Sequence, residues 1–229
     1  MKEGVFHMLG WVIAISALLL VFSVCLIVSE YRHGPRERYI YKTLASLMFV
    51  ALGAIGLYLH HWEALPIVLG LLFSFGGDGF LALYDHKKHN YDFYLGIATF
   101  CLAQIAYSWH ALEGGYTMWE PLLLAIGLTV LAAVGIHLFQ MKLRGGFLAA
   151  ILVYSLLLTF AFSAALFRYF KDPGPATLLL AVGKALFLAS DVFLLFKYFY
   201  SRPHRHLTAW NLSTYYVAQL LLCLSITAV

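Results

Sequence analysis

Long apolar runs, separated by short polar segments, make up almost the whole chain. Each run has about 20 residues, which is enough for an α-helix to cross the roughly 30 Å hydrocarbon core of a bilayer. The pattern predicts eight membrane-spanning helices, near residues 6–28, 40–59, 65–84, 92–112, 119–139, 147–169, 176–199 and 207–228. The first run is uncharged from Leu9 to Val28 and no small-residue cleavage site follows it, so we interpret it as a retained span and not as a signal peptide.

The segments between the runs are short and rich in charged or turn-forming residues, as in "DHKKHN" and "KDPGPA". Short connections require neighbouring helices to run antiparallel and leave no room for a soluble domain. We therefore expect residues 1–229 to form a single all-α domain, a polytopic membrane helical bundle. The composition agrees, because 62% of the residues are hydrophobic and only 11% are charged, against about a quarter in soluble proteins.

Lysine and arginine are unevenly distributed between the connections. The first, third, fifth and seventh connections, with the adjacent helix ends, hold eleven of them, against three on the other side and Lys184 inside a span. The eleven are Arg32, Arg36, Arg38, Lys42, Lys87, Lys88, Lys142, Arg144, Lys197, Arg202 and Arg205. Since short cytoplasmic loops are enriched in these residues, both termini are predicted to be non-cytoplasmic. The topology suits a multi-pass protein of a bacterial inner membrane or of the endoplasmic reticulum.

The remaining composition narrows the expected partners. The net charge is +4 with no basic run, so nucleic acid is not expected to bind. The three cysteines, Cys25, Cys101 and Cys223, lie far apart inside apolar runs, which favours neither a disulfide framework nor a metal site. The histidines near the polar connections are interpreted as interfacial residues, and no metal is expected.

Two aspartates lie inside predicted spans. Asp78, in "FSFGGDGFLAL", stands about six residues before the cytoplasmic end of its helix, and Asp191 stands about eight before the end of its own. At 1.5 Å per residue, both lie roughly 9–12 Å below the same membrane surface. A carboxyl group is costly to place in hydrocarbon, so a functional role is favoured over a purely structural one. If the two groups face each other, one would keep its proton beside an ionised partner, which is an acid/base arrangement.

Other polar side chains are predicted at or below this depth. Lys42 opens the second helix at the cytoplasmic surface, where it is either a site for a phosphate or an ordinary interfacial lysine. Tyr215 reaches the depth of the aspartates, with Gln219 one turn further along the same face. Gln104 and Tyr107 share a face of the fourth helix and lie deeper. The alternative role for these hydroxyl and amide groups is to hold the helices together by hydrogen bonds.

Four ordered motifs carry a family resemblance. They are "LLFSFGGDGFLAL" in the third helix, "YLGIATFCLAQIAY" in the fourth, "ALFLASDVFLLF" in the seventh and "STYYVAQLLL" in the eighth. With them the chain resembles the YhhN-type membrane proteins, the lysoplasmalogenase family. Two positions depart from the family pattern: Gln104 stands where a histidine is usual, and Thr43 follows Lys42 where a proline is usual. Because glutamine does not titrate, we assign Gln104 no acid/base role.

The resemblance implies hydrolysis of the vinyl ether bond of lysoplasmalogens, which gives a fatty aldehyde and a glycerophospho-base. The substrate would be a lysophospholipid, and the reaction needs no cofactor. Asp78 and Asp191 would be the catalytic residues. The residues expected around them are Lys42, Ser74, Gln104, Tyr107, Ser190, Tyr215 and Gln219.

Two other functions remain open from the residues alone. The same aspartates could relay protons or bind a cation in a small transporter, or the protein could be a membrane scaffold without catalysis. An enzyme is expected to have a cavity that opens on the cytoplasmic side and is closed at its far end. A transporter needs a path to both faces.

Overall fold

The computed structural model describes residues 2–32, 35–113, 115 and 117–227, and within these ranges it is helical with no strands. The helices are α1 (Lys2–Arg32), α2 (Pro35–His60), α3 (Leu65–Lys87), α4 (Asn90–Leu112), α5 (Trp119–Leu138), α6 (Gly146–Lys171), α7 (Pro175–Phe199) and α8 (Leu207–Ser225). A short 3-10 helix, η1 (His61–Ala64), joins α2 to α3. Every predicted span thus coincides with a helix, although the last residue predicted for the eighth span, 228, lies outside the described residues.

Seven of the described helices, α1 to α7, are long and apolar enough to cross a membrane. These helices make the protein a multi-pass integral membrane protein. Helix α8 is not among them, and it carries polar residues such as Asn211 and Gln219, both of which are buried against other helices. The mean hydropathy of a helix in the middle of a bundle underestimates its suitability for a membrane, since its polar groups face protein and not lipid.

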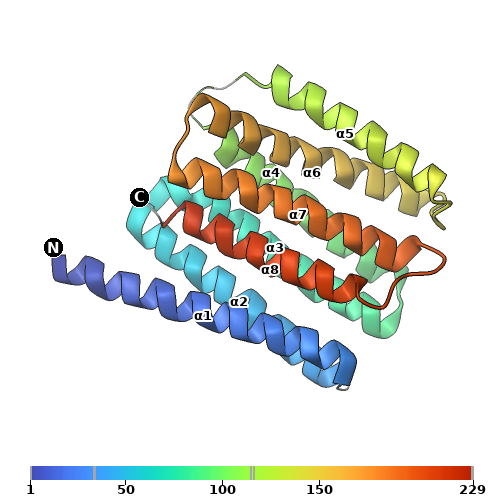
Figure 1. Cartoon of the computed structure of the whole chain (residues 1–229), viewed down its shortest axis with the longest axis horizontal. Coiled ribbons are helices and arrows are strands. Elements are labelled where there is room, and N and C mark those ends of the chain that lie inside the picture. The colour runs from blue at the N-terminus through green and yellow to red at the C-terminus, as the bar shows by residue number, and fades with distance from the viewer. Residues whose placement is uncertain (1, 33–34, 114, 116, 228–229) are drawn as a thin grey trace.

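Six of the helices form a closed ring. Going round it, α2 packs on α3, α3 on α4, α4 on α6, α6 on α7, α7 on α8, and α8 again on α2. Helix α1 lies outside this ring against α2 and α8, and α5 lies outside it against α6, so that these two helices flank the bundle in Figure 1. The interior of the ring is therefore the place where polar side chains can avoid lipid.

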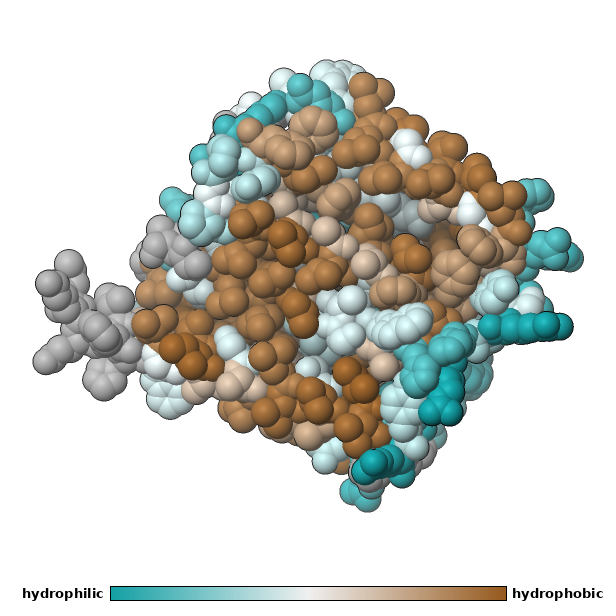
Figure 2. Space-filling model, in the orientation of Figure 1, coloured by the Kyte–Doolittle hydropathy of each residue, from teal (hydrophilic) through white to brown (hydrophobic). Residues whose placement is uncertain are grey.

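The surface has the pattern of a membrane protein. Figure 2 shows a hydrophobic band across the helices and hydrophilic residues gathered at the ends, most densely where α7 joins α8. Large apolar side chains of the outer helices are exposed, for example Leu123 of α5 at 70% and Ile13 of α1 at 61%. Such exposure would be unfavourable in water, and it is expected where the solvent is lipid.

The prediction that Lys42 opens the second helix is wrong. Helix α2 begins at Pro35, so Lys42 lies two turns inside it. Proline is well suited to the first turn of a helix, where its missing N–H costs nothing. The charged residues that follow it, Arg36, Glu37 and Arg38, extend the helix beyond the apolar run, so Lys42 does not lie at its start.

Close packing of α3 on α4 depends on glycines of α3. A methyl group added at Gly70 would lie 2.2 Å from Cε1 of Tyr107, and one at Gly77 would lie 2.5 Å from Cε2 of Phe100. Both rings are buried, at 1% and 8% exposure. The two glycines therefore allow aromatic rings of α4 to lie directly on the backbone of α3.

We expect Gly70→Ala to destabilise the protein and Gly79→Ala, in the same helix, to leave it unchanged or slightly more stable. Overpacking against the buried Tyr107 ring is expected to cost about 1–3 kcal/mol, whereas nothing lies within 4 Å of a methyl group at position 79. Thermal unfolding in detergent measures both. Equal unfolding temperatures for the two variants would contradict the packing described for α3 and α4.

Candidate active site

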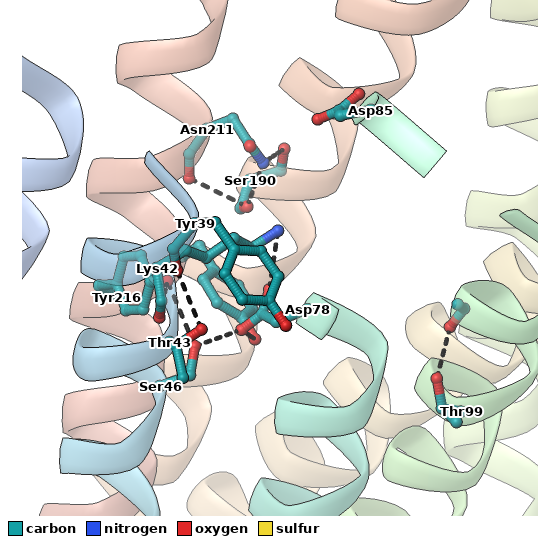
Figure 3. Close-up of polar contacts among 12 residues, drawn as sticks. Tyr39, Lys42, Thr43, Ser46, Asp78, Asp85, Thr99, Ser190, Asn211 and Tyr216 are labelled. Carbon is teal, nitrogen blue, oxygen red and sulfur yellow. Dashed lines mark hydrogen bonds and ion pairs between the residues drawn. The ribbon is translucent and has the colours of Figure 1, made fainter. Parts of the chain in front are cut away.

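Asp78 of α3 accepts hydrogen bonds from two other helices. The hydroxyl of Ser46 in α2 donates to its Oδ2 at 2.7 Å, and the hydroxyl of Tyr215 in α8 donates to the same oxygen at 2.8 Å. Nζ of Lys42 lies 3.4 Å from the other oxygen, Oδ1. Figure 3 shows Lys42 and Ser46 converging on Asp78 from α2. The carboxyl is only 6% exposed, so these three donors compensate for the water it has lost.

Tyr216 contacts the two residues of α2 that bind Asp78. Its hydroxyl lies 3.3 Å from Oγ of Ser46 and donates to the carbonyl oxygen of Lys42 at 3.4 Å. The ring of Tyr216 is fully buried. Tyr215 thus links α8 to α3 through the carboxylate of Asp78, and Tyr216 links α8 to α2 through Ser46 and Lys42.

Asp191 of α7 has a different and sparser environment. The hydroxyl of Tyr154 in α6 donates a short hydrogen bond to its Oδ2, and among the described residues this is the hydrogen bond that the side chain makes. Nε2 of Gln104 in α4 lies 3.5 Å from the same tyrosine hydroxyl, and Nζ of Lys184 donates to Oε1 of Gln104. A polar chain therefore runs from Lys184 through Gln104 and Tyr154 to Asp191.

The two aspartates line one cavity of about 840 Å³. The cavity is bordered by ring helices and by the end of α1, and it reaches the end of the bundle where α3 and α7 finish, which we call the basic end. Its outer part is bordered by basic residues and two acids: Arg36, Arg38, Lys88, Lys197, Glu30 and Asp85. Asp85 lies between Lys88 and Lys197, at 3.6 and 3.7 Å. The cavity therefore passes from a charged rim to a carboxyl-lined interior.

A layer of fully buried side chains lies beneath the aspartates. Tyr107 donates to Oε1 of Gln219 at 3.1 Å, and its hydroxyl lies 3.2 Å from Oγ of Ser74. Nζ of Lys184 is 4.8 Å from the centre of the Tyr107 ring and 4.6 Å from that of Phe187. These five side chains are at most 1% exposed, so they close the bundle below the cavity.

The sequence of this chain is similar to a known protein family. A model of the YhhN family matches residues 37–226, from the first turn of α2 to just beyond the end of α8. The chain belongs to the YhhN family. No solved structure matches it. The matched region contains the whole six-helix ring, whereas α1 precedes it.

The structure brings together only some of the residues that the YhhN resemblance implies for the site. Lys42 and Tyr215 contact Asp78 and border the cavity with both aspartates. Gln104 reaches Asp191 only through Tyr154. Ser74, Tyr107 and Gln219 belong to the layer beneath and border no cavity that contains an aspartate. Ser190 is turned toward α8, where it forms three hydrogen bonds with Asn211, as drawn in Figure 3.

In this YhhN protein, sequence reasoning missed Tyr154, which donates to Asp191, and Asn211, which contacts Ser190. Tyr154 stands eight residues after the start of α6 and Asp191 eight before the end of α7, so the matched depth was available as a signal. Tyrosines are common in these spans, however, and depth alone does not select one. Asn211 was the other omission, although an amide in the first turns of α8 is typical of a helix contact. Among the described residues, no group of three His, Cys, Asp or Glu side chains is placed to hold a metal ion.

The Lys184–Gln104 contact gives a prediction about stability. Gln104→Leu keeps the size of the side chain but leaves the buried Nζ of Lys184 without its acceptor. We expect a loss of about 1.5–3 kcal/mol, the range for hydrogen bonds to charged groups. In the double variant Gln104→Leu/Lys184→Met, part of this loss should disappear because the unpaired polar group has also gone. Thermal unfolding of the four proteins measures the coupling, and strictly additive effects would contradict a direct interaction.

Proposed function

We propose that this protein is a membrane hydrolase that cleaves the vinyl ether bond of lysoplasmalogens to a fatty aldehyde and a glycerophospho-base. Lysoplasmalogenase is the known activity of the YhhN family, and the chain matches that family over most of its length. The observation that carries the proposal is the pair of carboxyl groups, of buried Asp78 and half-buried Asp191, in one cavity with a basic rim.

The chemistry requires an acid and a place for positive charge. Hydrolysis of a vinyl ether begins with transfer of a proton to the β-carbon of the double bond, which leaves an oxocarbenium ion. Water adds to that ion and loses a proton, and the resulting hemiacetal collapses to an aldehyde and an alcohol. A protonated carboxyl group can supply the first proton, and an ionised one can stabilise the cation and receive the proton of the water.

We assign the two roles from the hydrogen bonds. Asp78 accepts two hydroxyl donors on Oδ2 and has Lys42 beside Oδ1, an arrangement that favours the ionised form. Asp191 accepts one hydroxyl on Oδ2, which leaves Oδ1 to carry a proton toward the cavity. Asp191 would therefore be the acid, and Asp78 the carboxylate that faces the cation and orients water.

Lys42 would form an ion pair with Asp78 and would not be the main contact of the substrate phosphate. Its Nζ already lies 3.4 Å from the carboxylate, and its side chain is 19% exposed. The phosphate of a lysophospholipid would instead lie among the basic residues of the outer cavity, such as Arg36, Lys88 and Lys197. Those residues lie in α2, directly after α3 and in α7, and they border the cavity.

The buried layer beneath the cavity favours an enzyme over a transporter. In α7, Lys184 lies between Asp191 and Leu180, and Leu180 borders a separate cavity at the opposite end of the bundle. In α4, Tyr107 lies between Phe100 of the first cavity and His110 of the second. Both Lys184 and Tyr107 are at most 1% exposed, so the two cavities are separated by packed side chains.

Replacing either aspartate by asparagine should abolish aldehyde release from an alkenyl lysophospholipid. Asparagine keeps the size and most hydrogen bonds but removes the acid at position 191 or the charge at position 78. Because the pair acts as a unit, each single change is expected to cost about as much activity as the double change. Purified protein in detergent, assayed for free aldehyde, measures this. Asp172→Asn, at an exposed position between α6 and α7, is the matched control and should retain full activity.

Thermal unfolding of the same variants separates catalysis from folding. Asp78→Asn and Asp191→Asn should unfold near the wild-type temperature while losing activity. Substantial aldehyde release from either properly folded variant would exclude acid catalysis by this pair.

We also propose that α8 is an eighth span and that both termini are non-cytoplasmic. The excess of lysine and arginine at the basic end supports this orientation, and α8 packs along α7 within the ring. In a variant without native cysteines, His89→Cys and Arg205→Cys should react with a membrane-impermeant maleimide only from the cytoplasmic side. Thr117→Cys and a cysteine added after Val229 should react only from the other side. Labelling of Arg205→Cys and the added cysteine from one side would mean that α8 does not cross the membrane.

A further inference from the structure

We infer that an apolar chamber beside Asp191 binds the hydrocarbon chain of a single-chain lysophospholipid, with the polar head in the basic cavity. This inference rests on the proposed function and gives the substrate a position and a direction. The chamber, of about 310 Å³, is bordered by α3, α4, α5, α6 and α7. Most of its wall is aliphatic or aromatic, with Ile97, Leu128, Ala132, Leu158 and Leu188 among the residues that border it. A chamber of this kind suits a hydrocarbon chain and would not solvate a phosphate.

The chamber and the basic cavity adjoin each other at Asp191. Asp191 borders both, and so do Leu81, Phe100, Leu194 and Tyr198. A ligand that spans both spaces would pass from a charged lining to an apolar one, as suits an amphiphile. The carboxyl of Asp191 stands at the boundary.

The order of groups in the lipid matches the order of groups in the protein. A lysoplasmalogen has, in sequence, the alkyl chain, the β-carbon, the α-carbon, the ether oxygen, glycerol and phosphate. The protein offers the apolar chamber, Asp191, then Asp78 with Lys42, and then the basic rim. With the chain in the chamber, the β-carbon that receives the proton lies beside Asp191, and the α-carbon that becomes cationic lies toward Asp78.

The chamber is also open to the bilayer. Leu131 of α5 and Val192 of α7 border it and are 66% and 45% exposed, which places them on the lipid-facing surface. A chain can therefore enter sideways from the membrane, and one longer than the chamber can extend into lipid. A second groove, bordered by Thr43, Gly76 and Gly79, reaches Asp78 between α2 and α3, and it is the competing location for the chain.

Photo-crosslinking distinguishes these locations. The probe is an alkyl-ether lysophosphocholine that lacks the vinyl double bond, so it is not hydrolysed, with a diazirine midway along its chain. After irradiation of the purified protein, mass spectrometry should find the label on chamber residues of α5 and α6. Ala132→Phe places a ring in the chamber and should reduce this labelling by about tenfold, equivalent to about 1.4 kcal/mol of binding.

Matched variants control for indirect effects. Ala133 is the next residue of α5 and does not border the chamber, so Ala133→Phe should be labelled like the wild type. Should Ala132→Phe fail to fold, Leu131→Trp and Val130→Trp form a second pair at exposed positions, of which only the first borders the chamber. Label confined to the groove between α2 and α3, label spread evenly over the lipid-facing surface, or equal loss in both members of a pair would overturn the inference. Competition by a diacyl phospholipid as strong as that by the lysolipid would also overturn it.

The outcome is independent of catalysis because the probe cannot react. Chamber labelling in a protein that releases no aldehyde from an alkenyl lysophospholipid would disprove the proposed activity and keep the lipid site. Aldehyde release by a protein whose chamber is not labelled would support the proposed activity and disprove the lipid site.

Discussion

The cost of placing a carboxyl group away from water governs the interior of this protein. Asp78 can occupy its position because α2 and α8 each direct a hydroxyl at it and Lys42 adds a positive charge. Asp191 depends on Tyr154, and Tyr154 in turn on Gln104. These donors come from four of the other helices in the ring, so satisfying the two carboxyls also fixes how the ring closes. The polar contacts that would support the proposed chemistry and those that hold the helices together are in large part the same contacts.

Close packing of α3 on α4 allows the layer of buried side chains beneath the aspartates to form. With no side chain at Gly70, the ring of Tyr107 lies against α3 and its hydroxyl reaches both Ser74 and Gln219. The layer thus joins α3, α4 and α8 one turn or more below the aspartates. Its side chains are at most 1% exposed, so they separate the cavity of the aspartates from the cavity at the opposite end of the bundle.

The positions of the helices along the chain could be predicted from the sequence because membrane thickness sets their length and hydropathy marks them. The equal depth of Asp78 and Asp191 followed from counting residues to the helix ends, and both indeed border one cavity. The partners of these residues could not be predicted in the same way. A pairing such as Lys184 with Gln104 depends on which helices are neighbours and how they are rotated, and neither is encoded in the periodicity of a single helix.

The error over Lys42 has a similar origin. Hydropathy locates the edge of the hydrocarbon, but a helix can continue past that edge into the polar region, as α2 does from Pro35. Tyr215 and Gln219 show that a shared helix face does not by itself place two residues in the same site. They share a helix face as expected, yet one turn along the axis is enough to put the first on Asp78 and the second on Tyr107.

The junction of a polar cavity and an apolar chamber at one carboxyl group also bears on what happens after bond cleavage. Hydrolysis at that junction would divide an amphiphile into an oily half and a water-soluble half, each already lying in the compartment that dissolves it. The aldehyde could diffuse into the bilayer past Leu131 and Val192, while the glycerophospho-base left through the basic rim. The two fragments would leave in opposite directions. Their separation into lipid and water would prevent recombination, and each product could be released independently of the other.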